Sequence, residues 1–433
     1  MIGGGVAGLA TAAALGSTGA TVELLEARPY LGGRATSYAL PGTEIIDNCQ
    51  HILLRCCVNL LDFYRRLEVI HHIEFAREIT FLEPGGRISV FGRGVLPAPL
   101  HFTECFLRLR FLSWRDKAAV ARAFLAILRE RTRRQDLEEI SMLDWLREKG
   151  QTQNAIERFW RQVLVSAINE ELDRMAASHG FQVFWLGFLA AADSYEMGVP
   201  QVPLGELYTS PAWTKMPNVR ITLRAPVARV ATAEQKVVGV QMEDGTEHQA
   251  AVVVSAVPFE KAAALAPEAN LDTSAFLHSS ITGVHLWFDR PVTELPHATL
   301  LDRDLQWFFS KEEGRYLQLV VSASERWLKL SRREVIDRSL AELTEFLPLV
   351  AGARLLNAQV VKEVRATYSA RPGLSKHRPE AKTRLANFVL AGDWTRTGWP
   401  STMEGAARSG YRAAEVVSDL LGRPQKFLLP DIA

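Results

Sequence analysis

The chain has 433 residues, of which 48% are hydrophobic and 23% are charged. This is the composition of a soluble globular protein of two or three domains, and it excludes disordered, collagen-like and disulfide-scaffold proteins. Lys and Arg number 50 against 49 Asp and Glu, a formal net charge of +1, so no overall charge draws the chain to nucleic acid.

Neither a membrane span nor an export signal is visible in the sequence. The longest apolar run, residues 181–192, is shorter than the roughly 18 residues that a spanning helix needs. No charged and apolar signal-peptide pattern opens the printed sequence. The four cysteines form no C-x-x-C pair and no cluster with histidine, which predicts a reduced, cytoplasmic protein without a metal site.

The first residues carry a phosphate-binding pattern. Gly3, Gly5 and Gly8 form G-x-G-x-x-G together with an Ala-rich helix predicted over residues 6–16. In such a loop the first glycine permits a tight turn, and the second lets the backbone approach a pyrophosphate. The third lets the helix pack closely on a sheet with its N-terminus toward the phosphates.

An acidic residue and an arginine-glycine motif follow this helix. A strand predicted over residues 21–25 leads to Glu26, which is placed to bind a ribose hydroxyl. The next motif, R-x-x-x-G-G-R, is similar to one in flavoproteins of the amine oxidase and phytoene desaturase superfamily. The resemblance implies FAD rather than NAD, with cofactor contacts from Arg28, Gly32, Gly33 and Arg34. The alternative is a surface turn with two solvated arginines.

The first strand of the nucleotide fold is short in this sequence. A dinucleotide fold needs about five apolar residues before its first glycine, whereas only Met1 and Ile2 precede Gly3. The expectation is therefore a natural chain that starts a few residues upstream of Met1.

Charge is unevenly distributed over residues 95–134. An apolar stretch over residues 95–106 precedes a segment with two acidic and nine basic residues, the latter being Arg108, Arg110, Arg115, Lys117, Arg122, Arg129, Arg131, Arg133 and Arg134. Basic side chains beside an apolar helical face fit a helix in a membrane interface. A solvated basic face on a core helix is the open alternative. If the substrate is a lipid, we expect peripheral attachment to the inner face of the cytoplasmic membrane.

The middle of the chain predicts a second domain and a return to the first. Alternating residues over 218–258 predict strands, a hairpin at 243–245 and a buried strand at 252–257. In the FAD superfamily a similar stretch rejoins the cofactor domain, which implies a backbone contact from Val227 to the adenine end. No second G-x-G-x-x-G occurs, which argues against a built-in nicotinamide domain.

The predicted fold class is α/β, with a discontinuous Rossmann-type FAD-binding domain and a mixed sheet-plus-helix substrate domain. The FAD-binding domain comprises residues 1–75, 200–262 and 381–422. The substrate domain comprises residues 76–199 and 263–380, with residues 423–433 as a tail. In the substrate domain, strands are predicted over 78–90 (a hairpin), 283–288, 306–309 and 316–322, and helices over 114–131 and 332–346.

A strand and a small-residue helix are predicted near the C-terminus. A buried strand is predicted over residues 387–391, and Ser401 with Glu404 forms a capping box that predicts a helix start. Small residues on that helix permit close backbone packing, namely Gly405, Ala406, Ser409, Gly410 and Ala413.

The superfamily has a similar motif at this end of the chain. The resemblance implies that Asp393 binds the ribityl chain and that Gly392, Thr402 and Met403 also contact FAD. A helix N-terminus carries about half a positive charge, which would favour an anionic reduced flavin at its pyrimidine edge.

Two motifs narrow the resemblance. Residues 47–51 (D-N-C-Q-H) resemble the D-N-G-Q-H motif of squalene-associated FAD-dependent desaturases, also known as hydroxysqualene dehydroxylases, and residues 398–405 (G-W-P-S-T-M-E-G) resemble the same family. Cys49 stands where that family usually has glycine. The family implies FAD-dependent reductive dehydroxylation of hydroxysqualene to squalene for hopanoid synthesis. Its substrate is a lipophilic C30 isoprenoid, and the sequence leaves the external electron donor open.

Asp47, Gln50 and His51 are the catalytic candidates that this resemblance suggests. Reduced flavin would deliver a hydride from N5 as water leaves, and the leaving hydroxide needs a proton. An ordinary histidine pKa suits His51 to the role of general acid, with Gln50 positioning. Asp47 is better explained as holding the loop against the flavin.

Three other functions stay open. A carotenoid or phytoene-type FAD desaturase would use the same fold in the oxidative direction. A flavin amine oxidase would share both end motifs. A non-enzymatic isoprenoid escort protein is disfavoured, because it would not need the flavin contacts that Gly3, Glu26 and Asp393 are placed to make.

Overall fold

The computed structural model describes residues 1–40 and 45–432. Its strands are β1 Val22–Leu25, β2 Ser37–Ala39, β3 Ile45–Asp47, β4 Leu53–Leu54, β5 Ile73–Ala76, β6 Glu78–Leu82, β7 Ile88–Gly92, β8 Met197–Pro200, β9 Val219–Thr222, β10 Val227–Ala233, β11 Lys236–Met242, β12 Glu247–Gln249, β13 Val253–Ser255, β14 His278–Phe288, β15 His297–Leu300, β16 Trp307–Lys311, β17 Tyr316–Ser322, β18 Leu355–Tyr368 and β19 Phe388–Leu390. Its helices include α1 Val6–Gly16, α2 Val58–Arg66, α3 Thr103–Arg108, α4 Trp114–Glu130, α5 Met142–Glu148, α6 Gln153–Ala155, α7 Gln162–Ile168, α8 Ala177–Phe184, α9 Leu204–Tyr208, α10 Phe259–Leu265, α11 Glu325–Leu328, α12 Arg332–Phe346 and α13 Met403–Leu420, with π-helical turns at Ile156–Arg161 and Trp185–Leu189.

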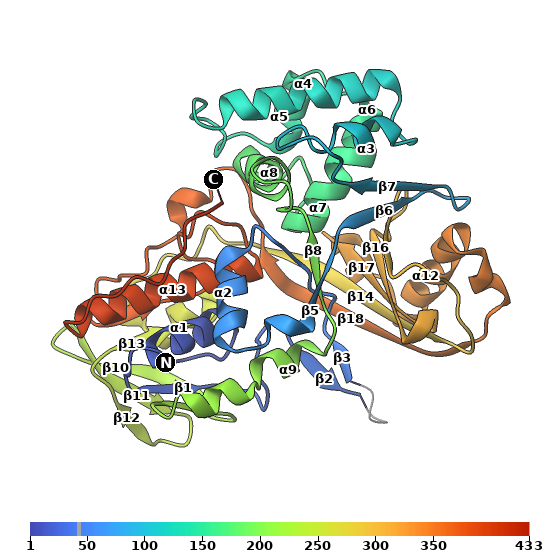
Figure 1. The fold of residues 1–433 in the computed structure, drawn as a ribbon. Coiled ribbons are helices and arrows are strands. Elements are labelled where there is room, and N and C mark those ends of the chain that lie inside the picture. Colours follow the sequence, from blue (N-terminus) through green and yellow to red (C-terminus); the bar gives the residue numbers. More distant parts are fainter. Residues whose placement is uncertain (41–44, 433) are drawn as a thin grey trace.

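The two ends of the chain build one parallel sheet. β1 pairs with β9 and β13 pairs with β19, both in parallel, and Ile2 bridges the two pairs through Leu25 and Ser255. Helices α1 and α13 lie side by side at this sheet (Figure 1). A Cβ on Gly410 would lie 2.4 Å from a carbonyl oxygen of α1, so the small residues of α13 permit this approach, as predicted.

A seven-stranded mixed sheet forms the second part of the molecule. Its strand order is β18-β14-β17-β16-β15-β6-β7, and β15 with β6 is the parallel pair among otherwise antiparallel neighbours. Helix α12 packs on this sheet at the right of Figure 1. The predicted hairpin over residues 78–90 and the predicted strands over 283–288, 306–309 and 316–322 are confirmed. The 14-residue β18 was not predicted, because its side chains are mostly half-buried and show little alternation.

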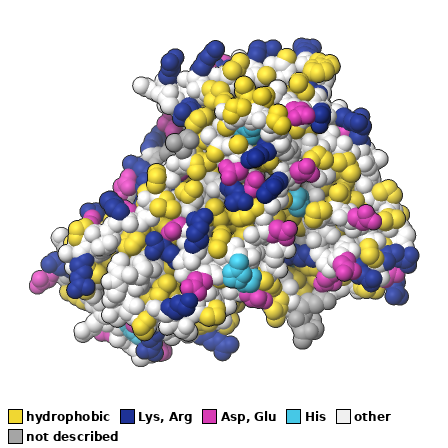
Figure 2. Space-filling model, viewed as in Figure 1, with side chains coloured by type: hydrophobic (Ala, Val, Ile, Leu, Met, Phe, Trp, Pro, Cys, Tyr) yellow, Lys and Arg dark blue, Asp and Glu magenta, His cyan; other side chains and the backbone are white. Residues whose placement is uncertain are grey.

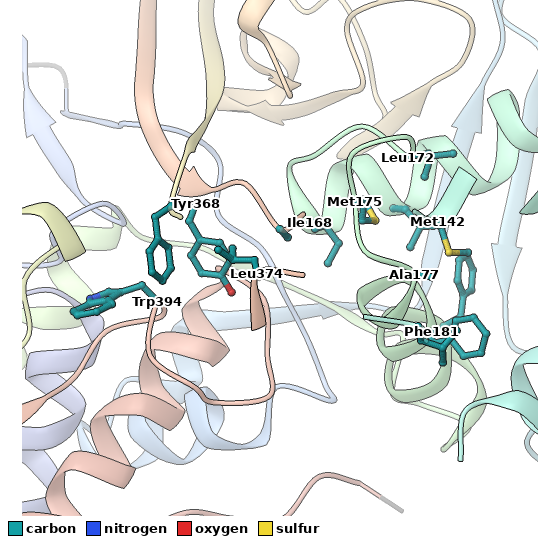
Figure 3. Packing of buried hydrophobic residues seen from close by; sticks show 14 of the residues in the cluster. Met142, Ile168, Leu172, Met175, Ala177, Phe181, Tyr368, Leu374 and Trp394 are labelled. Carbon is teal, nitrogen blue, oxygen red and sulfur yellow. The ribbon is translucent and has the colours of Figure 1, made fainter. Parts of the chain in front are cut away.

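A layer of helices, α3 to α8, covers the β6–β7 end of this sheet (Figure 1). The largest hydrophobic cluster joins this layer to the rest of the molecule. In Figure 3 its labelled side chains run from Trp394 and Tyr368, through Ile168, to Met142 and Phe181. The observed fold is therefore the predicted mixed α/β fold, with the helical layer packed on both other parts.

Over the described residues, no helix is both long and apolar enough to cross a membrane. The same residues contain no group of three or more histidine, cysteine or carboxylate side chains that could hold a metal ion. All four cysteines are free thiols.

Candidate functional site

The glycine loop holds α1 tightly against the sheet. Gly3 has a φ of +102°, a left-handed conformation that favours glycine, and a Cβ on Gly8 would lie 2.0 Å from the Gly3 carbonyl oxygen. The first and third glycines therefore do what the sequence predicted. Gly5 is the N-cap of α1 and no side chain of the described residues caps it, so the first amides of the helix stay available to an anion.

Gly32 and Gly33 face this helix N-terminus from the R-x-x-x-G-G-R motif. Gly5 and Gly32 form an isolated parallel bridge, and Gly32 donates its amide to the Gly4 carbonyl at 2.8 Å. A Cβ on Gly33 would approach the Gly5 Cα to 3.1 Å, and both Gly32 and Gly33 have positive φ. The two backbones thus form a cradle that any side chain would fill.

Glu26 lies beside this cradle at the end of β1 and is 9% exposed. Its Oε2 accepts the Gly4 amide at 2.6 Å and its Oε1 accepts the Arg28 amide at 2.8 Å. Each carboxylate oxygen keeps a lone pair, so a ribose diol still has two acceptors here. Val227 starts β10, two residues after Ala225, whose amide donates to the Glu26 carbonyl at 2.9 Å. The adenine contact of Val227 stays a prediction.

Arg34 and Asp393 join the two ends of the chain. The Arg34 guanidinium is ion-paired with the buried Asp393 carboxylate, which also accepts a hydrogen bond from the Ser401 hydroxyl. Gly392 has a φ of +136° and donates its amide to Ser409 Oγ at 2.8 Å. Asp393 is thereby fixed next to the start of α13.

The predicted capping box at the start of α13 is wrong. The N-cap is Thr402, whose Oγ1 accepts the Gly405 amide at 3.0 Å, and the helix begins at Met403. Ser401 is unavailable as a cap because its hydroxyl serves Asp393. Glu404 instead crosses to α2, where its carboxylate accepts the Leu60 amide at 2.7 Å.

Glu404 is a buried carboxylate that helps to close the N-terminus of α2. Beyond its bond to α2, its Oε1 accepts from the Asn59 side chain at 2.9 Å, and Arg408 approaches it to 3.5 Å. Burial raises the pKa of Glu404, while these donors oppose that shift. This carboxylate therefore ties α13 to α2 at the bottom of the cavity described below.

The loop that carries the catalytic candidates packs under the large sheet. Asp47 Oδ1 accepts from the Ser37 hydroxyl at 2.6 Å and from the Leu204 amide at 3.0 Å, and Lys311 Nζ lies 3.6 Å from Oδ2. Because both oxygens of this buried carboxylate already have partners, its geometry supports the loop-holding role considered from the sequence. Cys49 is buried and packs among Met197 and neighbouring apolar side chains.

The surroundings of His51 favour its neutral form. Burial lowers its pKa, and the Cys49 carbonyl 2.9 Å from Nδ1 is the largest opposing influence. A carbonyl oxygen only accepts hydrogen bonds, so Nδ1 carries the proton and Nε2 a lone pair. Gln50 makes one long contact, from Nε2 to the His51 carbonyl at 3.5 Å, and its buried Oε1 has no partner among the described residues. The catalytic roles of His51 and Gln50 stay predictions.

A large apolar cavity opens between the helical layer and the sheets. Its volume is about 640 Å³, and apolar side chains from α2, α3, α4, α7, α8, β6 and β7 form most of its wall. Thr402, Met403, Trp399 and Cys57 line it at the start of α13 and α2. The cavity therefore reaches the helix N-terminus that the resemblance assigns to the flavin.

The other end of the cavity is formed by exposed apolar side chains. Leu100, Leu107, Trp114 and Leu125 line it and are 59%, 45%, 71% and 53% exposed. Figure 2 shows Lys and Arg side chains along the top edge of the molecule, where α4 lies, with apolar side chains beside them.

Four of the nine basic side chains in residues 108–134 contact partners within the protein. Arg108 pairs with Glu104 at 2.7 Å, and Arg131 lies over the Trp185 ring at 3.7 Å from its centroid. Lys117 donates to the Leu107 carbonyl at 2.6 Å, and Arg134 pairs with Asp136 and Glu148.

Several polar residues near these sites were missed from the sequence. His285 and Gln318 face each other across β14 and β17, and Gln162 and Thr299 interrupt the cavity wall. The sequence signal that could have revealed them is a polar residue within an apolar strand, as in the Y-L-Q-L-V-V-S of the buried strand β17.

The family model of flavin containing amine oxidoreductase matches residues 6–418. The chain belongs to this family. Among the curated relatives of this chain is the zeta-carotene desaturase of Synechocystis. The two sequences are 27% identical, and the match covers 96% of each chain. The 15-cis-phytoene desaturase of Synechococcus elongatus is 24% identical, covering 96% of this chain and 94% of the relative.

Solved structures share the fold of this amine oxidoreductase. An oxidoreductase from Methanosarcina mazei has a TM-score of 0.72 at 19% identity, over 94% of this chain and 97% of its own. The cyclohexylamine oxidase of Brevibacterium oxydans has a TM-score of 0.67 at 17% identity, over 98% of each chain.

FAD is the cofactor of this flavoprotein family. The residues at the two chain ends fit it: the uncapped α1 N-terminus and the Gly5–Gly33 cradle suit a pyrophosphate, and Glu26 suits a ribose. The protein is an FAD-dependent oxidoreductase.

Proposed function

We propose that this oxidoreductase acts on a long, linear isoprenoid, and that its reaction is the reductive dehydroxylation of hydroxysqualene to squalene. The observation that carries the substrate class is the cavity of about 640 Å³. Its volume lies within the range of small-molecule sites, while its wall is almost entirely apolar. Such a wall suits a hydrocarbon chain better than an amine, since an amine needs polar partners for its charge.

The finer assignment depends on two motifs and their placement. Residues 47–51 and 398–405 carry the resemblance to hydroxysqualene dehydroxylases, and both contact the Arg34–Asp393 pair. Asn48 Nδ2 donates to the Arg34 carbonyl at 2.8 Å, and the Ser401 hydroxyl donates to Asp393. Thr402 and Met403 of the second motif also line the cavity. Reduced FAD, when bound, supplies the hydride that this reduction consumes. The apolar wall excludes water from the hydrocarbon chain of the substrate.

Carotenoid desaturation is the second candidate. The curated relatives that match along almost the whole chain are named zeta-carotene desaturase and 15-cis-phytoene desaturase. Because a carotenoid precursor is also a long isoprenoid, the same cavity suits it. The two reactions differ in the direction of electron flow, which gives a direct test.

The test incubates the reduced protein with hydroxysqualene under anaerobic conditions and, separately, the oxidised protein with phytoene or zeta-carotene. Formation of squalene together with reoxidised flavin supports dehydroxylation. Formation of a more unsaturated polyene with reduced flavin, and no squalene, replaces the proposal with desaturation. Chromatography and the flavin absorbance give both readings from the same samples.

His51 is proposed as the proton donor to the leaving hydroxyl. Burial lowers the pKa of His51, contrary to the ordinary value expected from the sequence, so the imidazole must first gain a proton at Nε2, the nitrogen left free by the Cys49 carbonyl. Once protonated there, it is a strong acid. His51→Gln should lower turnover while the protein keeps its FAD, as shown by absorbance. Turnover equal to that of the wild type would remove His51 from the mechanism.

We also propose that the cavity is filled from a membrane surface. The exposed Leu100, Leu107, Trp114 and Leu125 surround its outer end, next to the basic side chains of α4. The triple variant Leu100→Glu, Leu107→Glu and Leu125→Glu should no longer sediment with anionic phospholipid vesicles. Sedimentation at the wild-type level would favour a solvated basic face.

A further inference from the structure

Two buried polar side chains interrupt the apolar wall of the cavity. Gln162 on α7 is 6% exposed, Thr299 on β15 is fully buried, and both line the cavity. Gln162 Nε2 donates to Thr299 Oγ1 and, at 3.1 Å, to the Gln306 carbonyl. The amide group of Gln162 therefore uses both of its hydrogens and is fixed in orientation.

This arrangement leaves one acceptor and one donor without partners in the part of the chain that the structure describes. Gln162 Oε1 accepts no hydrogen bond, and the Thr299 hydroxyl accepts from Gln162 but donates its own hydrogen to no group. A ligand group that supplies these two partners gains both hydrogen bonds, so a ligand that carries one is favoured. A single hydroxyl group, which both donates and accepts, satisfies the pair.

The other buried polar side chains of this wall, the cysteine thiols apart, already have partners. Lys117 donates to the Leu107 carbonyl at 2.6 Å, and Glu404 accepts from the N-terminus of α2. Gln162 and Thr299 are therefore the buried pair in the wall with hydrogen-bonding capacity to spare.

Gln162 also lines a second cavity of about 800 Å³. The wall of this second cavity is largely charged, with residues such as Arg161, Glu171, Asp304 and Arg338. Gln162 thus lies between the apolar cavity and a charged one, and a polar group of a ligand would be placed toward that side.

We infer that Gln162 and Thr299 bind the hydroxyl group of a long apolar alcohol and so select it over a hydrocarbon of the same length. The substrate hydroxyl donates to Gln162 Oε1 and accepts from Thr299 Oγ1. The inference rests on the proposed function, because hydroxysqualene brings this hydroxyl and a carotenoid precursor does not. A site built to bond a hydroxyl discriminates strongly against an analogue that lacks it.

The test measures binding rather than turnover. The FAD-loaded protein in detergent micelles is titrated with hydroxysqualene and with squalene, and tryptophan fluorescence reports occupancy. The wild-type protein should bind hydroxysqualene about tenfold more tightly than squalene. Thr299→Val and Gln162→Met should each reduce this preference about tenfold by weakening the alcohol alone.

Two further variants separate this role from a structural one. Thr299→Ser keeps the hydroxyl and should keep the preference. Thr344→Val on α12 removes a hydroxyl that donates to the Leu340 carbonyl at 2.8 Å outside the cavity, and it should also keep the preference.

The outcomes distinguish the two proposals. If Thr299→Val and Gln162→Met retain the wild-type preference, the inference is overturned while an alcohol substrate stands. If wild type binds squalene as tightly as hydroxysqualene, the inference fails, and the anaerobic incubation then decides separately whether the dehydroxylation survives.

Discussion

The cofactor-binding side of this flavoprotein and the wall of its apolar cavity differ in how much room they leave for an added carbon atom. At Gly8 a Cβ would lie 2.0 Å from a backbone oxygen, whereas Ala167 lines a cavity with about 640 Å³ of free volume. The cofactor side is made from backbone that approaches backbone, and few residue types fit there. The cavity side is made from apolar side chains of many helices and strands, and many combinations of side chains would enclose a similar space.

This difference separates what the fold holds constant from what it can vary. The nucleotide side is specified by glycines and carboxylates within two short segments, near residues 3–34 and 392–404. We infer that substrate choice depends on the wall, where the Gln162–Thr299 pair interrupts apolar side chains. The following substitutions test how sharp this contrast is.

Gly8→Ala should have the largest effect. The new methyl group meets the Gly3 carbonyl oxygen and cannot be accommodated without moving α1, so we expect a loss of about 3 kcal/mol in the free energy of unfolding and loss of bound FAD. Urea unfolding and flavin absorbance measure both. Gly352→Ala is the matched control, since nothing lies within 4 Å of its added carbon. If Gly8→Ala were as stable as Gly352→Ala, the cofactor side would not be more tightly packed than an open surface position.

Asp393→Asn should weaken FAD binding by about tenfold with a smaller effect on unfolding. The substitution removes the negative charge that holds Arg34 and accepts from Ser401. Fluorescence titration with FAD gives the dissociation constant. Asp302→Asn, which breaks the ion pair with Arg158 away from the cofactor region, should leave FAD affinity at the wild-type value.

His285→Gln should reduce the acid sensitivity of the fold. Burial, with Lys311 nearby, lowers the pKa of His285 to about 4 from the usual 6.5, so between these values the unfolded chain binds the proton first. Stability therefore falls as the pH drops from 6.5 toward 4. Between pH 7 and pH 5.5 this histidine accounts for a loss of about 1 kcal/mol. Urea unfolding at both pH values measures this loss in the wild type and in His285→Gln. If the variant loses as much free energy of unfolding between pH 7 and pH 5.5 as the wild type does, His285 is not the cause.

Ala167→Leu should have the smallest effect on stability, within about 0.5 kcal/mol, because the added atoms enter free volume. It should leave FAD bound while lowering squalene affinity severalfold. Ala14→Leu, on the fully buried face of α1, is the contrasting variant and should destabilise by about 2 kcal/mol. Similar losses for the two variants would mean that the cavity wall is as tightly packed as the cofactor side.

The local sequence pattern was sufficient to predict those helices and strands whose bounds are determined by residues close together in the sequence. The bounds of α1, α12 and β17 agree with the predicted ranges, because apolar periodicity and turn residues determine them within a few residues. The FAD side followed in the same way, since a glycine turn, a helix N-terminus and an acidic residue are all contained in residues 3–34. The same reasoning failed at Ser401, whose hydroxyl had two possible partners.

By itself, therefore, the sequence determined the α/β class, the FAD motifs and the small-residue contact of α13. The tertiary structure decided which polar groups meet: Glu404 with α2, Asp47 with Leu204, and Gln162 with Thr299. These partners lie more than a hundred residues apart in sequence, so no local spacing reveals them. Burial makes each pairing necessary, because a buried polar group without a partner is costly, and burial is a property of the assembled fold.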